Sequence, residues 1–133
     1  MHAAGPGLAL TYQEMGGAPL PDGTMAQVKD IAQRARFGEA IALRLFEQEG
    51  ALLSRVLSPA VNLLNPSRIV LGGGVALAFD LFGDALGRSV ATMTYQRANP
   101  HLEICPTPLG YEAGLYSGAA IAIARRENHP IYR

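Results

Sequence analysis

The sequence has no tryptophan and a single cysteine, Cys105. One cysteine cannot form an internal disulfide, so the disulfide framework of a small secreted domain is excluded. Its setting in the apolar stretch LEICPTP indicates a buried, unreactive thiol. No apolar run reaches the roughly 20 residues of a membrane span, and residues 1–10 lack the basic and apolar segments of a signal peptide. We therefore expect a cytoplasmic protein without a membrane partner.

An excess of one charge is also missing, because eleven basic residues balance eleven acidic ones. Lys29 is the only lysine, and the pairs Arg34/Arg36 and Arg125/Arg126 lie in helical contexts that indicate solvated helix faces. The chain therefore offers no basic surface for a polyanion, and we expect no direct nucleic-acid contact from it. Its 133 residues are 49% hydrophobic, which is enough for one domain with its own core.

Patterns that carry catalysis or metal binding are sparse in this sequence. The histidines lie near the two ends of the chain and in a turn, without a partner at metal-ligand spacing, so we expect no zinc or other metal site. The aspartates fall in loops or on helix faces, where caps and solvated charges are the simpler interpretation. We therefore predict no catalytic residue in this chain. The residues concerned are His2, His101, His129, Asp22, Asp30, Asp80 and Asp84.

Hydrophobic periodicity predicts two helices in the first half of the chain. After the turn-rich loop GGAPLPDG, a short helix is expected from Thr24, a candidate N-cap, to near Gly38. A long helix follows over residues 39–65, with a kink or break near Ser58 because Pro59 removes a backbone hydrogen bond. The C-terminal half of this helix is apolar on nearly every side. We expect it to be buried between a sheet and a further layer or subunit.

The second half of the chain alternates strands and helices. Residues 68–71 and 102–106 are predicted as strands, and residues 75–95 and 112–126 as helices, the last one rich in small residues that allow close packing. This order is typical of α/β architecture with parallel strands. Two strands are few for such a sheet, so either further strands escape detection or the chain is part of a larger sheet.

The stretch RIVLGGGVALAFD places three consecutive glycines between a strand and a helix. Glycine lets the backbone approach a ligand closely, and the N–H groups at a helix start attract anions. The loop would also lie at the carboxyl end of a parallel strand, where open α/β sheets bind ligands. It matches neither the GxGxxG fingerprint nor the phosphate loop, since no lysine follows. From the residues alone, a nucleotide cradle and a simple tight turn are equally supported.

The run VNLLNPSRIVLGGGVA resembles the C-terminal lobe of the ROK family, which comprises repressors, open reading frames and sugar kinases. The preceding stretch, FGEAIALRLFEQEGALLSRVLSPAVNLLNP, is similar to the family's long helix before that strand. PTPLGYEAGLYSGAAIAI is similar to its closing loop and small-residue helix, and the opening AAGPGLALTYQEMGG resembles the segment after its zinc-binding cysteines. The resemblance covers essentially the whole chain.

The resemblance implies an α/β fold: a partial actin-like ATPase lobe of the RNase-H-like type, with a short, mostly parallel sheet flanked by helices. It implies that residues 1–133 form a single domain, the C-terminal, nucleotide-side portion of a ROK protein, without the N-terminal lobe. The cofactor would be ATP, with Mg²⁺ in the parent enzyme, and the loop 109–112 would lie near the same cleft. The residues implied for the adenosine end of ATP and the helix start behind it are Gly72, Gly73, Gly74 and Val75.

Several family motifs have no counterpart here, namely the N-terminal phosphate motif, the catalytic aspartate, the sugar-binding Glu/His motif and the zinc-ligating cysteines. Sugar phosphorylation needs a base for the hydroxyl proton and a metal-bound triphosphate. The expected function is therefore the C-terminal part of an ATP-dependent kinase of a hexose or N-acetylhexosamine, inactive alone, with sugar bound only by the full-length parent. This part would contribute the adenosine-side glycine loop and a dimer surface, and we expect a homodimer. The alternatives are the sensing and dimerisation lobe of a ROK repressor, and a stand-alone module that forms a homodimer through the apolar face of residues 52–64 and the small residues of the last helix.

Overall fold

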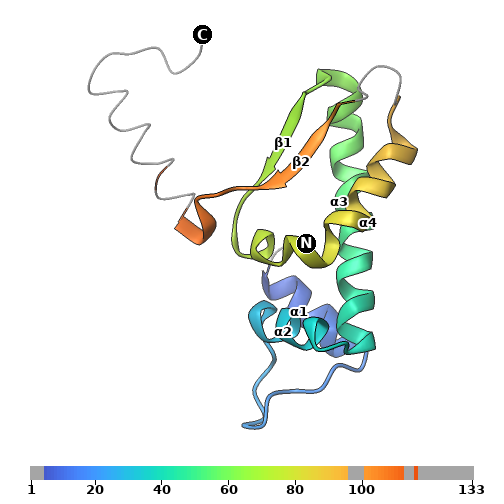
Figure 1. Ribbon diagram of the computed structural model, residues 1–133. Helices are drawn as coiled ribbons and strands as arrows, with labels where there is room; N and C mark the ends of the chain where they lie inside the picture. Colours follow the sequence, from blue (N-terminus) through green and yellow to red (C-terminus); the bar gives the residue numbers. More distant parts are fainter. Residues whose placement is uncertain (1–4, 96–100, 113–115, 117–133) are drawn as a thin grey trace.

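The computed structural model describes residues 5–95, 101–112 and 116. The long helix α3 has α1 and α2 packed at one end and α4 alongside it, and the two strands run beside this helix pair (Figure 1). In chain order, with η marking a 3₁₀ helix, the elements are α1 (Gly5–Glu14), α2 (Val28–Arg36), α3 (Ala40–Leu64), β1 (Arg68–Leu71), η1 (Gly74–Ala78), α4 (Phe79–Met93), β2 (Glu103–Pro106) and η2 (Gly110–Glu112).

The strands β1 and β2 pair in parallel, as the sequence predicts, with Ile69 opposite Ile104. Both isoleucines are partly buried and pack against the core. At the start of the pair, an Arg68 guanidinium nitrogen lies 2.7 Å from a carboxylate oxygen of Glu103. Val70 is 54% exposed. Strand β1 therefore has an open face in the described part of the chain.

Helix α2 begins later than predicted, at Val28, with Gln27 as its N-cap residue. A carboxylate oxygen of Asp30 accepts the Gln27 backbone N–H at 3.0 Å, which satisfies one of the free donors at the helix start. Thr24 is not the cap. Its N–H and hydroxyl both donate to Asp22 Oδ1, at 3.0 and 2.6 Å, and so close the preceding turn. These bonds hold the pKa of Asp22 below its usual range.

Helix α3 runs unbroken for 25 residues, so of the kink or break predicted near Ser58 the break does not occur. Pro59 deprives the Arg55 carbonyl of its helical partner, but both residues lie on the exposed side of the helix, where water can bond that carbonyl. The helix ends as predicted at the Asn-Pro pair. Asn65 adopts a left-handed conformation with φ 46°, and Pro66 cannot continue the helix.

Helix α3 is buried on one side rather than on all sides. Ser58 and Val61 are buried, whereas Leu52, Val56 and Leu63 are exposed, the last by 82%. The exposed residues are spaced by four and seven positions and so lie along one line of the helix surface. We call Leu52, Val56 and Leu63 the α3 stripe. The prediction of all-round burial is therefore corrected for the described residues, because α4 packs along one side of α3 only.

The helix predicted from Val75 starts at Phe79, because residues 74–78, which include Val75, form the 3₁₀ helix η1. The end of α4 is fastened to α3 by Asn62, whose side-chain NH₂ donates to the Met93 carbonyl and whose Oδ1 accepts the Tyr95 N–H, both at 3.2 Å. The last predicted helix, residues 112–126, lies almost entirely outside the described residues.

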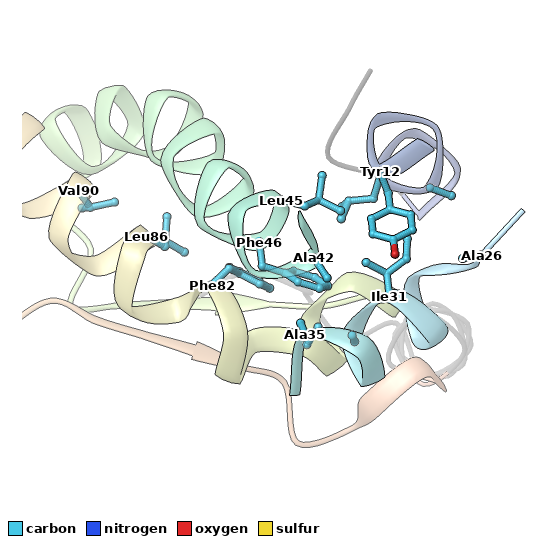
Figure 2. Close-up of a cluster of buried hydrophobic side chains, with 14 of the residues drawn as sticks. Tyr12, Ala26, Ile31, Ala35, Ala42, Leu45, Phe46, Phe82, Leu86 and Val90 are labelled. Atoms are coloured by element: carbon cyan, nitrogen blue, oxygen red, sulfur yellow. The ribbon is translucent and has the colours of Figure 1, made fainter. Parts of the chain in front are cut away.

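The core is centred on the contact between α3 and α4, with α1 and α2 extending it (Figure 2). A Cβ atom added at Gly50 would lie 2.7 Å from the Phe82 carbonyl oxygen and 2.8 Å from the Leu86 nitrogen. The two helix backbones therefore approach more closely there than any side chain allows. The largest fully buried side chains are Tyr12, Phe46, Phe82, Leu8, Ile31 and Leu86.

We predict that Gly50→Ala destabilises the chain by about 1–3 kcal/mol, because the new methyl group meets the backbone of α4. The gain in helix propensity, about 1 kcal/mol, does not offset this clash. Gly87→Ala is the matched control, since Gly87 is exposed on α4 and has nothing within 4 Å of an added Cβ. It should be neutral or stabilising. Urea denaturation measures both, and equal effects would contradict the close helix contact.

Candidate functional site

The candidate site lies where the two parallel strands end. Because β1 and β2 are parallel, the loops that follow them meet at the same edge of the sheet. The Thr107 N–H donates to the Leu71 carbonyl at 2.7 Å and joins the two loops. A hollow of about 410 Å³ opens there, and we call it the strand-end hollow. Its lining residues are Gly73, Ala76, Leu77, Phe79, Asp80, Pro106, Thr107 and Gly110.

Gly73 and Gly72 of the loop differ in whether their backbone conformation requires glycine. Gly73 has φ 89° and ψ 178°, a conformation that is almost restricted to glycine, and an added Cβ would have open space around it. Gly72 does not have a positive φ, and its Cβ would lie 3.8 Å from a Thr107 methyl group, which is ordinary contact. Gly73 is therefore fixed by its backbone and opens toward the strand-end hollow.

The structure places the four predicted nucleotide residues in different surroundings. Gly73 lines the strand-end hollow, whereas Gly72, Gly74 and Val75 do not. Gly74 begins η1, and Val75 is partly buried against the hydrophobic core. The Ala76 N–H donates to the Gly73 carbonyl at 3.1 Å, which closes the first turn of η1. A nucleotide role for these four residues stays a prediction.

The loop after β2 faces the glycine loop. Gly110 lines the strand-end hollow with φ 60°, and η2, which starts there, is in contact with η1. The Leu109 N–H donates to the Thr107 hydroxyl oxygen at 3.2 Å and shapes the turn. The glycine loop and the loop 109–112 therefore lie side by side at one hollow, as the sequence predicts for two loops of the same cleft.

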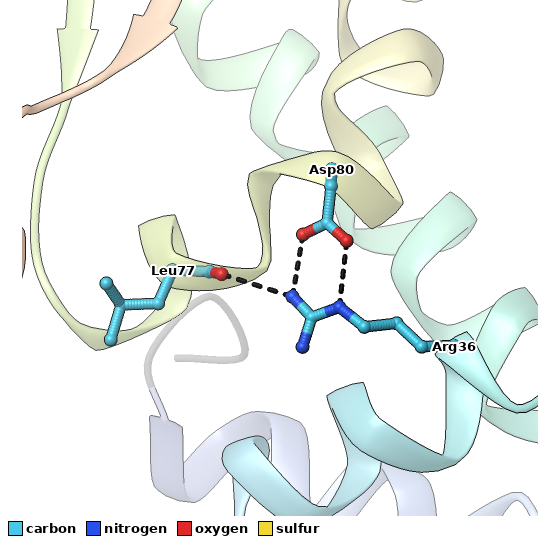
Figure 3. Close-up of polar contacts among 3 residues, drawn as sticks. All are labelled: Arg36, Leu77 and Asp80. Atoms are coloured by element: carbon cyan, nitrogen blue, oxygen red, sulfur yellow. Dashed lines mark hydrogen bonds and ion pairs between the residues drawn. The ribbon is translucent and has the colours of Figure 1, made fainter.

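Sequence reasoning missed an ion pair, Arg36–Asp80, which Figure 3 shows. It borders the strand-end hollow, because Asp80 is one of the lining residues. Arg36 at the end of α2 donates to both carboxylate oxygens of Asp80 at the start of α4, at 2.8 and 2.9 Å, and to the Leu77 carbonyl at 3.3 Å. The hydrogen bond from Arg36 lowers the pKa of Asp80. Asp80 and Arg36 were both interpreted as solvated charges. They are 44 residues apart, and no local spacing signals such a pair.

Arg34, the other arginine of this segment, is also engaged. Its guanidinium donates to the Tyr12 hydroxyl at 2.8 Å and to the carbonyls of Ala18 and Pro19. Tyr12 in turn donates to a carboxylate oxygen of Glu39 at 2.5 Å. Burial, followed by this bond to Glu39, raises the pKa of Tyr12. The cluster ties the loop after α1 to α1 and α3, so we assign Arg34 a structural role.

The lining of the strand-end hollow favours a ligand group that carries no charge. Most of its lining is apolar or backbone, with Thr107 as a hydroxyl group and Asp80 as the one charged side chain among the described residues. Arg36 already neutralises that carboxylate. Such a surface suits a flat, apolar base or a ribose better than a triphosphate, which needs cationic groups.

Within the described residues, no helix is long and apolar enough to cross a membrane. In the same part of the chain, no three His, Cys, Asp or Glu side chains gather as metal ligands. Cys105 is partly buried, and its thiol lies 3.8 Å from the Ile69 carbonyl across the strand pair. Cys105 is therefore less buried than the sequence predicts.

We predict that Gly73→Ala destabilises the chain by about 1–3 kcal/mol, because alanine is strained at this positive φ. Gly72→Ala is the matched control, with an ordinary backbone conformation and room for a methyl group, and should change stability by no more than about 0.5 kcal/mol. Thermal unfolding followed by circular dichroism measures both. A Gly73→Ala variant as stable as Gly72→Ala would show that the loop does not hold this conformation.

Curated relatives of the chain include both repressors and kinases. It is 26% identical over 108 residues to the DNA-binding transcriptional dual regulator NagC of Escherichia coli, covering 81% of this chain and 25% of NagC. It is 27% identical over 121 residues to a glucokinase of Halalkalibacterium halodurans, covering 91% of this chain and 34% of that protein. The chain thus spans between a quarter and a third of the length of these relatives.

Solved structures share its fold. A sugar kinase candidate from Cytophaga hutchinsonii matches with a TM-score of 0.77 at 23% identity, over 90% of this chain and 42% of that one. A ROK family glucokinase from Streptomyces griseus, solved with glucose and AMPPNP, matches with a TM-score of 0.74 at 24% identity over the same shares. The predicted fold class is therefore confirmed: the chain is an α/β, partial actin-like ATPase lobe with a short parallel sheet flanked by helices.

The family assignment rests on the length of the match as well as on the fold. The model of the ROK family matches residues 1–126 of this chain, nearly its whole length. This range includes the long helix α3, the Asn-Pro turn, β1 and the glycine loop, in the order in which the sequence analysis found them. The chain belongs to the ROK family.

Proposed function

We propose that this chain is the C-terminal, nucleotide-side part of an ATP-dependent sugar kinase, whose substrate is a hexose or an N-acetylhexosamine. In this proposal the strand-end hollow receives the adenosine part of ATP. The observation that carries the proposal is an apolar hollow at the carboxyl ends of two parallel strands, bordered by Gly73 in a glycine-specific conformation. Ligands of open α/β sheets bind at this edge.

The lining supports the adenosine end of the nucleotide rather than the phosphates. Ala76, Leu77 and Phe79 supply an apolar surface for a purine, and the Thr107 hydroxyl supplies a hydrogen-bonding group beside it. Among the described residues, the lining contains no lysine or arginine that could bind a triphosphate. In the proposed parent, the groups that hold Mg²⁺ and the phosphates therefore come from another part of the protein.

The proposed chain is inactive alone, because phosphoryl transfer needs a base for the sugar hydroxyl. Two aspartates that could be considered as this base already have other partners. Asp80 forms an ion pair with Arg36, and Asp22 accepts a hydrogen bond from the Thr24 hydroxyl. The kinase assignment is supported by the shared fold with the Streptomyces griseus glucokinase, whose structure holds glucose and AMPPNP. Glucokinases are also among the curated relatives.

A second proposal is the sensing and dimerisation lobe of a ROK repressor. It is favoured by the repressors NagC and Mlc of Escherichia coli, which are as similar to this chain as the glucokinases are. The reading frame upstream of residue 1 distinguishes the two proposals. A phosphate motif alone would favour the kinase, and an added DNA-binding helix pair would favour the repressor.

We predict that the 133-residue chain binds ATP, ADP and adenosine with similar dissociation constants on the order of millimolar, because only the adenosine part contacts it. Leu77→Glu should weaken binding by roughly tenfold, since it replaces an exposed apolar part of the lining with a charge. Leu43→Glu, the same change at an exposed leucine outside both the strand-end hollow and the α3 stripe, is the matched control. Isothermal titration calorimetry measures each affinity.

The absence of heat at millimolar nucleotide, in a sample shown to be folded, would remove the proposal for the isolated chain. Binding of ATP without binding of adenosine would move the contact to the phosphates and contradict the proposed orientation. With ATP, Mg²⁺ and glucose, the pure chain should form no sugar phosphate. Detectable formation would overturn the assignment of the catalytic base to another part of the protein.

We propose, finally, that the chain forms a homodimer through the α3 stripe, whose exposed side chains lose unfavourable contact with water on association. Val56→Glu, which places a charge within the stripe, should shift the chain from dimer to monomer in sedimentation-velocity ultracentrifugation. Phe37→Glu is the matched control, because Phe37 is 83% exposed but lies outside the stripe. A wild-type chain that stays monomeric at all concentrations would contradict the proposal.

A further inference from the structure

A second, smaller hollow lies between α1 and α3, apart from the strand-end hollow, and we call it the α1–α3 pocket. Its volume is about 120 Å³, well below the roughly 300 Å³ or more of pockets that hold nucleotides or drug-sized ligands. Leu8, Leu45 and Leu52 form apolar walls. Glu14 from α1 and Glu49 from α3 bring carboxylate groups to it.

Glu49 is the unusual member of this pocket. The residue is only 3% exposed, and its Oε1 has no hydrogen-bond partner. Burial raises the pKa of Glu49. Buried carboxylates in folded proteins are normally paired or hydrogen-bonded. None of the described residues bonds to Oε1 of this one, which leaves that oxygen open to a ligand.

The walls of the pocket restrict what that ligand can be. Thr11 and Gln48 also line the pocket, but a bare metal ion needs several charged ligands, and the described residues bring no three His, Cys, Asp or Glu side chains together. A water molecule could bond to Oε1 but has no apolar part for the leucine walls. A cation on a short hydrocarbon stem satisfies both parts of the pocket, because the stem can contact the leucines while the charged end reaches the carboxylate.

We propose that the α1–α3 pocket binds one primary alkylammonium group, with the ammonium at Glu49 and its hydrocarbon stem against Leu8, Leu45 and Leu52. The group can belong to a free amine or to the lysine side chain of another polypeptide. Glu14, the other charged group of the lining, adds negative charge from α1. Leu52 is 43% exposed in the single chain, so the pocket of the monomer is reached from solvent along its side of α3. Because Leu52 also belongs to the α3 stripe, a homodimer through that stripe would close the pocket, and binding is tested at concentrations where the chain is monomeric.

The test is a titration of the 133-residue chain with n-butylammonium chloride, followed by NMR of the backbone amides. Saturable shifts are expected at Leu8, Leu45 and Glu49. n-Butanol, which has the same stem without the charge, and KCl, which has a charge without the stem, should give no saturable shift. Saturation by butanol or by K⁺ at equal concentration would overturn the proposal, as would the absence of saturation by butylammonium.

Two variants connect binding to the pocket. Glu49→Gln should weaken butylammonium binding by roughly tenfold or more, because the amide cannot balance the charge. Its melting temperature at neutral pH should not fall, since the variant removes an unpaired buried carboxylate. Leu52→Trp, at the partly exposed edge, should block entry and abolish binding even if Glu49→Gln fails to fold. Unchanged affinity in Leu52→Trp, or in folded Glu49→Gln, would contradict the site.

The source of the ammonium group is tested by a second ligand, Nα-acetyl-lysine N-methylamide, which carries the same group on a peptide-like backbone. Binding at least as tight as that of butylammonium would support a lysine side chain from another polypeptide. Binding of butylammonium alone would support a free amine. Failure of both amines would overturn this site and leave the proposed nucleotide function untouched, because the two hollows share no lining residue.

Discussion

The close contact of α3 with α4 at Gly50 is the constraint on which the rest of the structure depends. Helix α3 leads directly into β1, and α4 leads toward β2, so the distance between the helices decides whether the two strands can pair. The absence of a side chain at Gly50 brings the helix backbones together, and Asn62 fixes the far end of the same contact. Parallel pairing then brings both strand-end loops to one edge, which creates the strand-end hollow.

The predictions from sequence succeeded where the cause is local. Helix α3 follows from a long periodic pattern, its end from the Asn-Pro pair, and β1 from a short apolar run. They failed where tertiary contacts determine the bounds or the continuity of a helix. The packing of α3 carries the helix through Pro59, and Gln27 with Asp30 displaces Thr24 as the start of α2. Propensity alone ranks these choices only weakly.

The candidate site shows the same division. The glycine loop could be placed at a strand end from sequence, because a strand followed by glycines is a local pattern. The separate demands on Gly72 and Gly73 could not, because they depend on backbone angles that only the folded chain defines. The Arg36–Asp80 pair joins α2 to α4 across 44 residues, and nothing in the composition or spacing indicates it.

Asp80 and Glu49 show how the surroundings of a carboxylate determine what a hollow can bind. At the strand-end hollow, Arg36 satisfies Asp80 and lowers its pKa, so the lining presents a nearly neutral surface that suits the uncharged part of a nucleotide. In the α1–α3 pocket, Glu49 is buried, its Oε1 has no hydrogen-bond partner among the described residues, and its pKa is raised. The first hollow needs no charge from its ligand. The second is proposed to bind a cation at Glu49. The two hollows of one lobe would therefore select an uncharged group and a cationic group.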